Sequence, residues 1–184
     1  METKGLAVKV LLDYLRLHHA DKYTEWLNNL PLQSKNIFQN LIATDKWYSL
    51  HEAVIEPTVI LSRLLNTCLS DLAWNIGKYN ADVTLTGIYR IYVKLGTPRH
   101  IIDRASRIFS AFYNPSEMVV ASHKANEVVL HITKFPAPHL VVDNNIGGWI
   151  ERAIEISGSK DVKVKIPRSL TRGNPVTEFV VTWK

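Results

Sequence analysis

The sequence predicts an α+β fold, with a helical amino-terminal half followed by a strand–strand–helix–strand–strand unit. Three observations predict it. Apolar residues recur every three or four positions through much of residues 1–113, which is the period of a helix with one buried face. Beyond Asn114-Pro115, short segments alternate apolar and polar residues, as strands do. The segment IERAIEISGSKDVKVKI, residues 150–166, changes from the first period to the second at Gly158.

Length and composition favour one globular unit. The chain has 184 residues, of which 46% are apolar, so it can bury a core of ordinary size. We predict a single domain over residues 1–184, made of a helical part, 1–113, and a ββαββ part, 114–184. No apolar run reaches the ~18 residues that a membrane span needs, and charged residues interrupt the apolar start of the chain. We therefore expect a cytoplasmic protein that begins with an amphipathic helix.

The first third of the chain contains three predicted helices. The first covers about residues 4–19, which have a broad apolar face. Asp21 can cap a second, short helix, and Ser34 can start a third. The stretch TDKWYS, residues 44–49, is predicted to be a loop.

The longest predicted helix runs from Thr58 to about Lys78. Its leucines recur at spacings of three or four, and Gly77 is expected to end it. Asn80 and Asp82 then mark a polar break. Two further helices are predicted, over residues 84–95 and 98–113.

The second half is predicted to form a four-stranded antiparallel sheet with one helix across its face. The helix covers about residues 143–157, and Asp143 or Asn144 is expected to cap it. Gly147-Gly148, placed in its first turn, would let another backbone approach closely. Helix and sheet each have one apolar side, so each needs the other to bury it. The strands are expected at residues 118–123, 127–135, 161–166 and 178–184.

No catalytic or metal-binding group is predicted. The single cysteine, Cys68, stands among leucines and is interpreted as a small buried hydrophobe. None of the seven histidines has the spacing of a zinc site. In the predicted hairpin His123 faces Val128 and His131 faces Val120, so the two imidazoles are not cross-strand partners. Ser122-His123 lacks a nucleophile elbow and an orienting acid. We therefore expect a protein that is not an enzyme.

Two segments resemble known families. The ending GWIERAIEISGSKDVKVKI…RGNPVTEFVVTW resembles the ending of four-vinyl-reductase-like domains. The section GIYRIYVKLGTPRHIIDRASRIFSAFYNPSEMVV is similar to a myxobacterial family of unknown function. Both families are related in fold to haem-nitric-oxide-binding (H-NOX) domains and to small subunits of Golgi transport tethering particles. The resemblance covers residues 84–184 well and implies a bacterial signalling or binding domain with a pocket between helices and sheet.

The resemblance also implies which ligands the pocket does not take. H-NOX domains hold haem through a histidine that would fall near Ala105 or Ser106, whereas His100 lies near the start of that helix. The motif that grips the haem propionates is replaced by HITKF, residues 131–135. Classical haem is therefore disfavoured, and we expect no cofactor and no metal.

A thiolate site is disfavoured for a similar reason. Some four-vinyl-reductase-like domains carry cysteines near the last strand, where this sequence has Val176 and Thr177. A small hydrophobic molecule thus remains as the ligand that the resemblance implies.

Aromatic side chains on the middle helices are the candidate ligand-binding residues. Tyrosine combines an apolar body with a polar tip, which suits a mostly apolar site. Arg104 (or Arg90) could meet a carboxylate on a ligand. The alternative is that these aromatic side chains only fill the core. The candidates are Trp74, Tyr89, Tyr92, Arg104, Phe109 and Phe112.

Two other functions stay open. The chain could be a dimeric protein–protein adaptor that acts through its helical half, because Leu6, Leu27 and Leu30 exceed what one core needs. It could also bind nucleic acid through a basic carboxy-terminal hairpin, although lysines on an exposed strand are usually solvated and prevent edge pairing. The basic residues of that hairpin are Lys160, Lys163, Lys165, Arg168 and Arg172.

Overall fold

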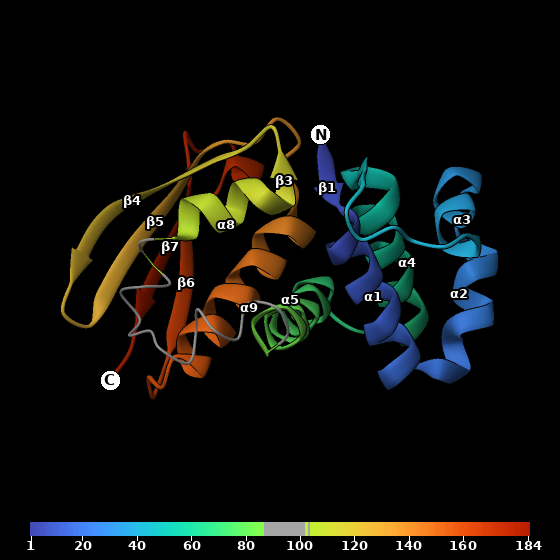
Figure 1. The fold of residues 1–184 in the computed structure, drawn as a ribbon, viewed down its shortest axis with the longest axis horizontal. Helices are drawn as coiled ribbons and strands as arrows, with labels where there is room; N and C mark the ends of the chain where they lie inside the picture. Colours follow the sequence, from blue (N-terminus) through green and yellow to red (C-terminus); the bar gives the residue numbers. More distant parts are fainter. Residues whose placement is uncertain (87–101, 103) are drawn as a thin grey trace.

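A helical part and a sheet part meet along two long helices, α5 and α9 (Figure 1). The structure is a computed structural model, and it describes residues 1–86, 102 and 104–184. Mixed helix and antiparallel sheet confirm the predicted α+β class. Most of the predicted helix 84–95 and the start of helix 98–113 lie outside the described residues.

The helical part begins with a strand that leads directly into the first helix. Predicted helix 4–19 is confirmed by α1, and the two short helices that follow it are also present. The elements are β1 (Glu2–Lys4), α1 (Gly5–His18), η1 (Ala20–Lys22), α2 (Tyr23–Asn29), α3 (Leu32–Gln39), β2 (Trp47–Ser49), the π-helix η2 (His51–Ile55), α4 (Glu56–Leu65) and α5 (Leu69–Thr86).

The sheet part has the predicted order of strand, strand, helix, strand and strand. A described helix precedes it and leads into a two-residue strand. The elements are α8 (Ala105–Phe112), β3 (Tyr113–Asn114), β4 (Glu117–Lys124), β5 (Glu127–Lys134), α9 (Leu140–Ile156), β6 (Lys163–Arg168), η3 (Leu170–Arg172) and β7 (Thr177–Thr182).

The main sheet has the order β4-β5-β7-β6, and every pairing in it is antiparallel. Its alternate side chains face the helices, as the period of two requires. His123 pairs with Val128, as predicted, but His131 pairs with Val119 and not with Val120. An irregularity between Val120 and Ser122 shifts the register, and regular alternation does not reveal such a bulge. The buried apolar residues of the two central strands are Val128, Leu130, Ile132, Phe179 and Val181.

A second, three-stranded sheet joins the chain start to two distant segments. Its order is β2-β1-β3, and Thr3 pairs with both Tyr48 and Tyr113. The prediction of a loop at TDKWYS was therefore wrong for Trp47–Ser49. Strands of two or three residues are too short to show a period, so only their pairing partners reveal them.

The predicted helix from Thr58 to Lys78 was also wrong, because the chain forms two helices there. Asn66 adopts a left-handed conformation, with φ +50°, and ends α4. Asparagine tolerates this conformation better than most residues. Cys68 consequently lies in the connection and is exposed, so its prediction as a buried hydrophobe was wrong.

Gly77 does not end a helix, and Asn80 and Asp82 do not form a break. All three lie inside α5, which continues to Thr86. Glycine is tolerated within α5 because α9 packs so closely that a side chain at this position would overlap its backbone. A Cβ on Gly77 would lie 2.0 Å from the backbone oxygen of Asn145 on α9.

Three predicted helix starts were misplaced. Helix α3 begins at Leu32, and Ser34 is buried within it. Asp21 lies in η1 and makes no side-chain cap. Helix α9 begins at Leu140 and is capped by His139, so Asp143 and Asn144 lie inside it. In each case a polar residue lies within a few positions of a helix start, where the sequence alone does not determine which residue begins the helix.

The contact between α5 and α9 is close because glycines lie at its centre. A Cβ on Gly148 would lie 2.1 Å from the backbone oxygen of Trp74, so the predicted close backbone approach is present. Polar contacts flank it: Trp74 Nε1 donates to Glu151 at 2.7 Å, and Lys78 Nζ lies 2.5 Å from the same carboxylate. Arg152 adds a bond of 2.8 Å to Asp82.

We expect Gly148→Ala to lower the free energy of unfolding by more than about 3 kcal/mol, because the backbone oxygen of Trp74 cannot move away without separating the helices. Gly173→Ala is the matched control. Gly173 has φ +78°, and a Cβ added there would meet nothing within 4 Å, so only backbone strain of about 1 kcal/mol is expected. Urea unfolding of both variants measures the difference. Equal losses would contradict the close-contact account.

His139 caps the amino-terminal end of α9. Its Nδ1 accepts the backbone N–H of Val141 at 3.1 Å. Burial lowers the pKa of His139, His51 lowers it further, and Asp143 and Glu56 raise it in part. The folded state therefore favours the neutral imidazole, which is the form that can accept a hydrogen bond.

Because the folded pKa of His139 lies below its unfolded value, the unfolded chain binds more protons as pH falls through about 6.5. We expect the stability of the native protein to decrease, relative to that of His139→Asn, between about pH 8 and about pH 5. Asparagine retains the cap and does not titrate. Urea unfolding at a series of pH values measures the difference, and identical pH slopes for the two proteins would rule out this role of His139.

Candidate functional site

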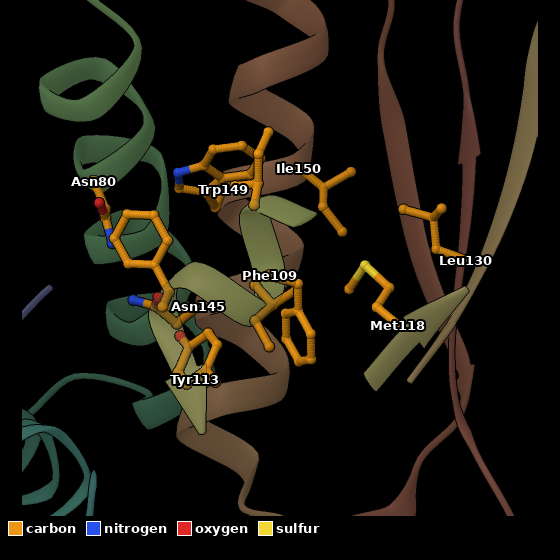
Figure 2. A pocket seen from close by; sticks show the side chains of 11 residues that line it. Asn80, Phe109, Tyr113, Met118, Leu130, Asn145, Trp149 and Ile150 are labelled. Atoms are coloured by element: carbon orange, nitrogen blue, oxygen red, sulfur yellow. The ribbon is translucent and has the colours of Figure 1, made fainter. Parts of the chain in front are cut away.

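A cavity of about 50 Å³ lies where α5, α8, α9 and the main sheet meet (Figure 2). Each of these elements contributes side chains to its wall, so the cavity lies at the junction of the two parts of the fold. The lining residues are Asn80, Ile108, Phe109, Phe112, Tyr113, Met118, Leu130, Asn145, Ile146, Trp149 and Ile150.

Most of the cavity wall is apolar, because it is a part of the core. Phe109 reaches it from α8, Met118 and Leu130 from the sheet, and Ile150 from α9 (Figure 2). Phe109 also packs on Tyr113, with ring centroids 5.2 Å apart.

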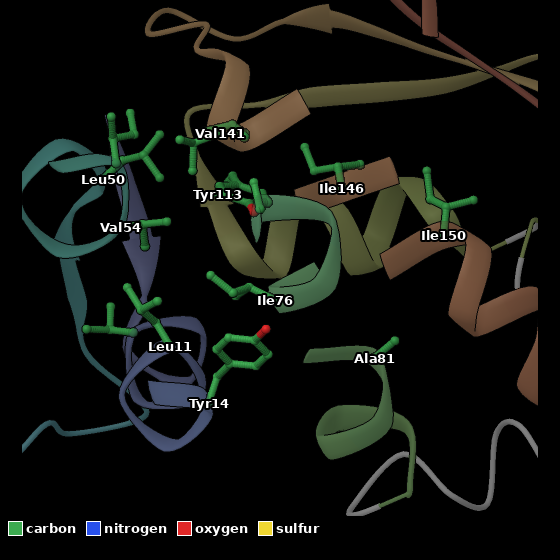
Figure 3. Close-up of a cluster of buried hydrophobic side chains, with 14 of the residues drawn as sticks. Leu11, Tyr14, Leu50, Val54, Ile76, Ala81, Tyr113, Val141, Ile146 and Ile150 are labelled. Atoms are coloured by element: carbon green, nitrogen blue, oxygen red, sulfur yellow. The ribbon is translucent and has the colours of Figure 1, made fainter. Parts of the chain in front are cut away.

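The core continues beyond the cavity toward the amino-terminal helix. Figure 3 shows Ile76 of α5 between Tyr14 of α1 and Ile146 of α9. Helix α5 is therefore packed against α1 on one side and against α9 on the other.

Two asparagines make the wall polar at one side. Asn80 and Asn145 are 6% and 8% exposed, and they come from the two helices that carry the close contact. Asn145 Nδ2 donates to the carbonyl oxygen of Ala73 at 3.4 Å. Asn80 Oδ1 is buried and has no hydrogen-bond partner among the described residues. A buried acceptor of this kind is normally paired, so this oxygen requires an explanation.

The other polar atoms near the cavity are already paired or remain neutral. Trp149 Nε1 donates to Thr84 Oγ1 at 3.3 Å, and Thr84 Oγ1 donates to the backbone oxygen of Asn80 at 2.7 Å. Burial raises the pKa of Tyr113, which keeps its phenol protonated. None of the described lining residues is charged.

The predicted ligand-binding residues occupy different places. Phe109 and Phe112 line the cavity. Trp74 packs on Gly147 and Gly148 in the contact between α5 and α9, and it is not among the lining residues. Arg104 is exposed and precedes α8. Tyr89 and Tyr92 lie outside the described residues, so their role stays a prediction.

Sequence reasoning missed the polar residues of the cavity. It places Asn80 in a break between helices, although Ile76, Asn80 and Thr84 follow one another at intervals of four. A polar side chain on the buried stripe of a helix is the signal that could have identified it. Asn145 gives the same kind of signal on the apolar face of α9, between Val141 and Ile146.

The described lining does not fit a haem. It offers iron only the thioether of Met118 and the phenol of Tyr113, and burial opposes the ionised phenolate that would bind a metal. A cavity of about 150 Å³ holds one benzene, so a cavity of about 50 Å³ is far too small for a porphyrin. His100 lies outside the described residues.

The described residues were searched for a metal cluster and for a membrane-spanning helix. Residues 1–86 and 104–184 contain no cluster of three histidine, cysteine, aspartate or glutamate side chains suited to a metal. No helix among them is long and apolar enough to cross a membrane.

One arginine of the basic hairpin is paired with an acid. Arg168 donates to Glu178, and His131 Nε2 lies 2.7 Å from the same carboxylate. These two contacts lower the pKa of Glu178.

No protein-family model matches the chain, and no curated protein is significantly similar to it in sequence. Solved structures are similar in fold. The Fe(II) unliganded H-NOX protein from K. algicida has a TM-score of 0.75 at 12% identity, over 98% of this chain and 96% of that one. An H-NOX protein from S. oneidensis in the Fe(II)NO state has a TM-score of 0.76 at 13% identity, over 98% and 99%.

A third structure agrees with these two. The H-NOX domain from Shewanella oneidensis in the Fe(II)CO state has a TM-score of 0.74 at 12% identity, over 98% of each chain. At this level of sequence identity the similarity shows a shared fold and does not show a shared binding site. The resemblances to four-vinyl-reductase-like domains and to the myxobacterial family stay predictions. The chain has an H-NOX-like fold.

Proposed function

We propose that this protein is a non-enzymatic sensory domain that binds a small hydrophobic molecule in the cavity between α5, α8, α9 and the sheet. The observation that carries the proposal is the cavity itself: an apolar space with a few polar groups, at the contact between two parts of the fold. The H-NOX-like fold supports it, because the similar proteins are described in Fe(II), Fe(II)NO and Fe(II)CO states. The proposed ligand is not a classically bound haem.

The position of the cavity suggests how binding could be signalled. Asn80 and Asn145 line the cavity and belong to the two helices whose backbones meet at Gly77 and Gly148. A ligand that fits one arrangement of these helices better than another shifts the population toward it. Since α5 also packs on α1, the shift would reach the amino-terminal helix.

The test uses xenon, an apolar probe small enough for the cavity, and the methyl resonances of the protein in NMR. We expect saturable shifts at Met118, Leu130 and Ile150, which line the cavity. Leu41, which is 95% exposed, serves as the control methyl and should not shift in a saturable way.

The same preparation is examined for a natural ligand. Mass spectrometry of a denatured extract should detect a small organic molecule, and an absorption scan should show no haem band. Cavity methyls that do not respond to xenon, in a protein that carries no molecule, would overturn the proposal.

The adaptor function rests on a different surface. Of the leucines that suggested it, Leu30 is buried and Leu6 and Leu27 are half-buried. Leu17, Leu32 and Leu41 are instead exposed at 65%, 69% and 95%. If the helical half forms a dimer, sedimentation should show a mass that depends on concentration, and replacing these three leucines by lysine should abolish it. A monomer at all concentrations would contradict the adaptor function.

The basic hairpin offers less support for nucleic-acid binding. Lys163 and Lys165 are exposed on β6, which is an edge strand of the main sheet. Lysines at such an edge prevent pairing with another chain, and this role needs no nucleic acid. We therefore keep nucleic-acid binding as the least supported alternative.

A further inference from the structure

Strand β4 forms one edge of the main sheet and lacks the residues that usually protect such an edge. In the described sheets β4 pairs only with β5, so the backbone groups on its other side bind no strand. The opposite edge strand, β6, carries Lys163 and Lys165, which discourage pairing with another chain. Residues 118–122 of β4, MVVAS, contain no charge and no proline, and Val119 and Val120 are exposed. This edge is therefore open to a further strand.

A bulge changes which residues of β4 share a face. The ladder to β5 passes from Val120 directly to Ser122, so Ala121 is an additional residue. Side chains that lie directly opposite each other in a ladder share a face of the sheet. Val119 before the bulge and Ser122 after it therefore lie on the same face, because their partners on β5 are two positions apart.

We infer that β4 pairs antiparallel with β4 of a second copy of this chain, which joins the two main sheets edge to edge. The strand covers Glu117–Lys124, and a two-fold axis through its middle places Glu117 of each copy opposite Lys124 of the other. The same axis places Val119 opposite Ser122. Alternate residues share a face, so Glu117 lies with Val119, and Lys124 lies with Ser122. Without the bulge, the residues of each opposed pair would face opposite sides of the sheet.

The charges at the two ends of β4 favour a second copy as the partner. Glu117 is exposed and the side chain of Lys124 is 73% exposed, so both can reach a neighbouring strand. Lys124 Nζ lies 2.7 Å from Glu127 on its own hairpin, but an exposed contact of this kind contributes little. Opposite charges on facing strands stabilise an antiparallel pair, whereas a parallel pair in register would place like charges together. The antiparallel pair thus has two charge matches, with uncharged residues between them.

The layers of the fold leave part of this edge accessible. Figure 1 shows the β4–β5 hairpin extending beyond α8 and α9 at the left of the view, so the described helices do not cover its tip. A pair of eight-residue strands is a small interface. We therefore expect a reversible dimer whose population rises with concentration.

The experiment exchanges the charges across the inferred pair and measures association of the full chain by sedimentation equilibrium. Glu117→Lys and Lys124→Glu each place like charges opposite one another twice in the dimer. We expect each single variant to associate at least about fivefold more weakly than the native protein. The double variant restores opposite charges, so it should associate within about twofold of the native protein.

Lys165→Glu is the matched control, because it makes the same change of charge as Lys124→Glu at the opposite edge of the sheet. It should associate like the native protein. All three substituted side chains are exposed, so the variants should fold normally. A dimer formed through the helical half would instead be insensitive to the charges of β4.

A native protein that stays monomeric at every concentration up to about 1 mM would overturn the inference. So would a dimer that Glu117→Lys leaves unchanged, or a double variant that fails to recover association. The inference does not rest on the cavity, so the response of the cavity methyl groups to xenon decides the proposed function separately.

Discussion

The rest of the structure depends on the close contact between α5 and α9. Two glycines allow it, because Gly77 and Gly148 each lie where a side chain would overlap the backbone of the other helix. The contact joins the amino-terminal helices to the main sheet, and its flanking ion pairs fix the two helices in register. The cavity lies beside this contact, because Asn80 of α5 and Asn145 and Trp149 of α9 line it.

The sequence predicted the carboxy-terminal half better than the amino-terminal half, for physical reasons. The two central strands of the main sheet, β5 and β7, alternate over six residues or more, so their period identifies the buried face before any partner is known. The strands around Thr3 and Tyr113 are two or three residues long, and their hydrogen bonds come from segments far along the chain. No local pattern contains that information.

The helix end predicted at Gly77 and the break predicted at Asn80 share one cause. Gly77 and Asn80 have poor intrinsic helix propensity, so a single sequence suggests that the helix ends there. A residue with poor helix propensity costs about 1 kcal/mol, and tertiary contacts can outweigh this cost. Helix α9 supplies such contacts at Asn145. At Asn66 the opposite error occurred, because an apolar stripe suggested continuity while the backbone turned to positive φ. The aromatic residues of α8 were predicted as a group, whereas the polar end of the cavity was not, although Asn80 lies on the buried stripe of α5.

The fold and the lining of the cavity carry different information about the ligand. Similarity to H-NOX proteins concerns how the helices and the sheet are arranged. It does not determine what enters the space, because the ligand is selected by the side chains around it. Here the described side chains of the wall are uncharged, and the volume is about 50 Å³. A space of this volume is far too small for an iron porphyrin, and an uncharged wall offers an ion no counter-charge. A shared fold therefore does not imply a shared ligand, because the side chains that select a ligand differ while the backbone arrangement is kept.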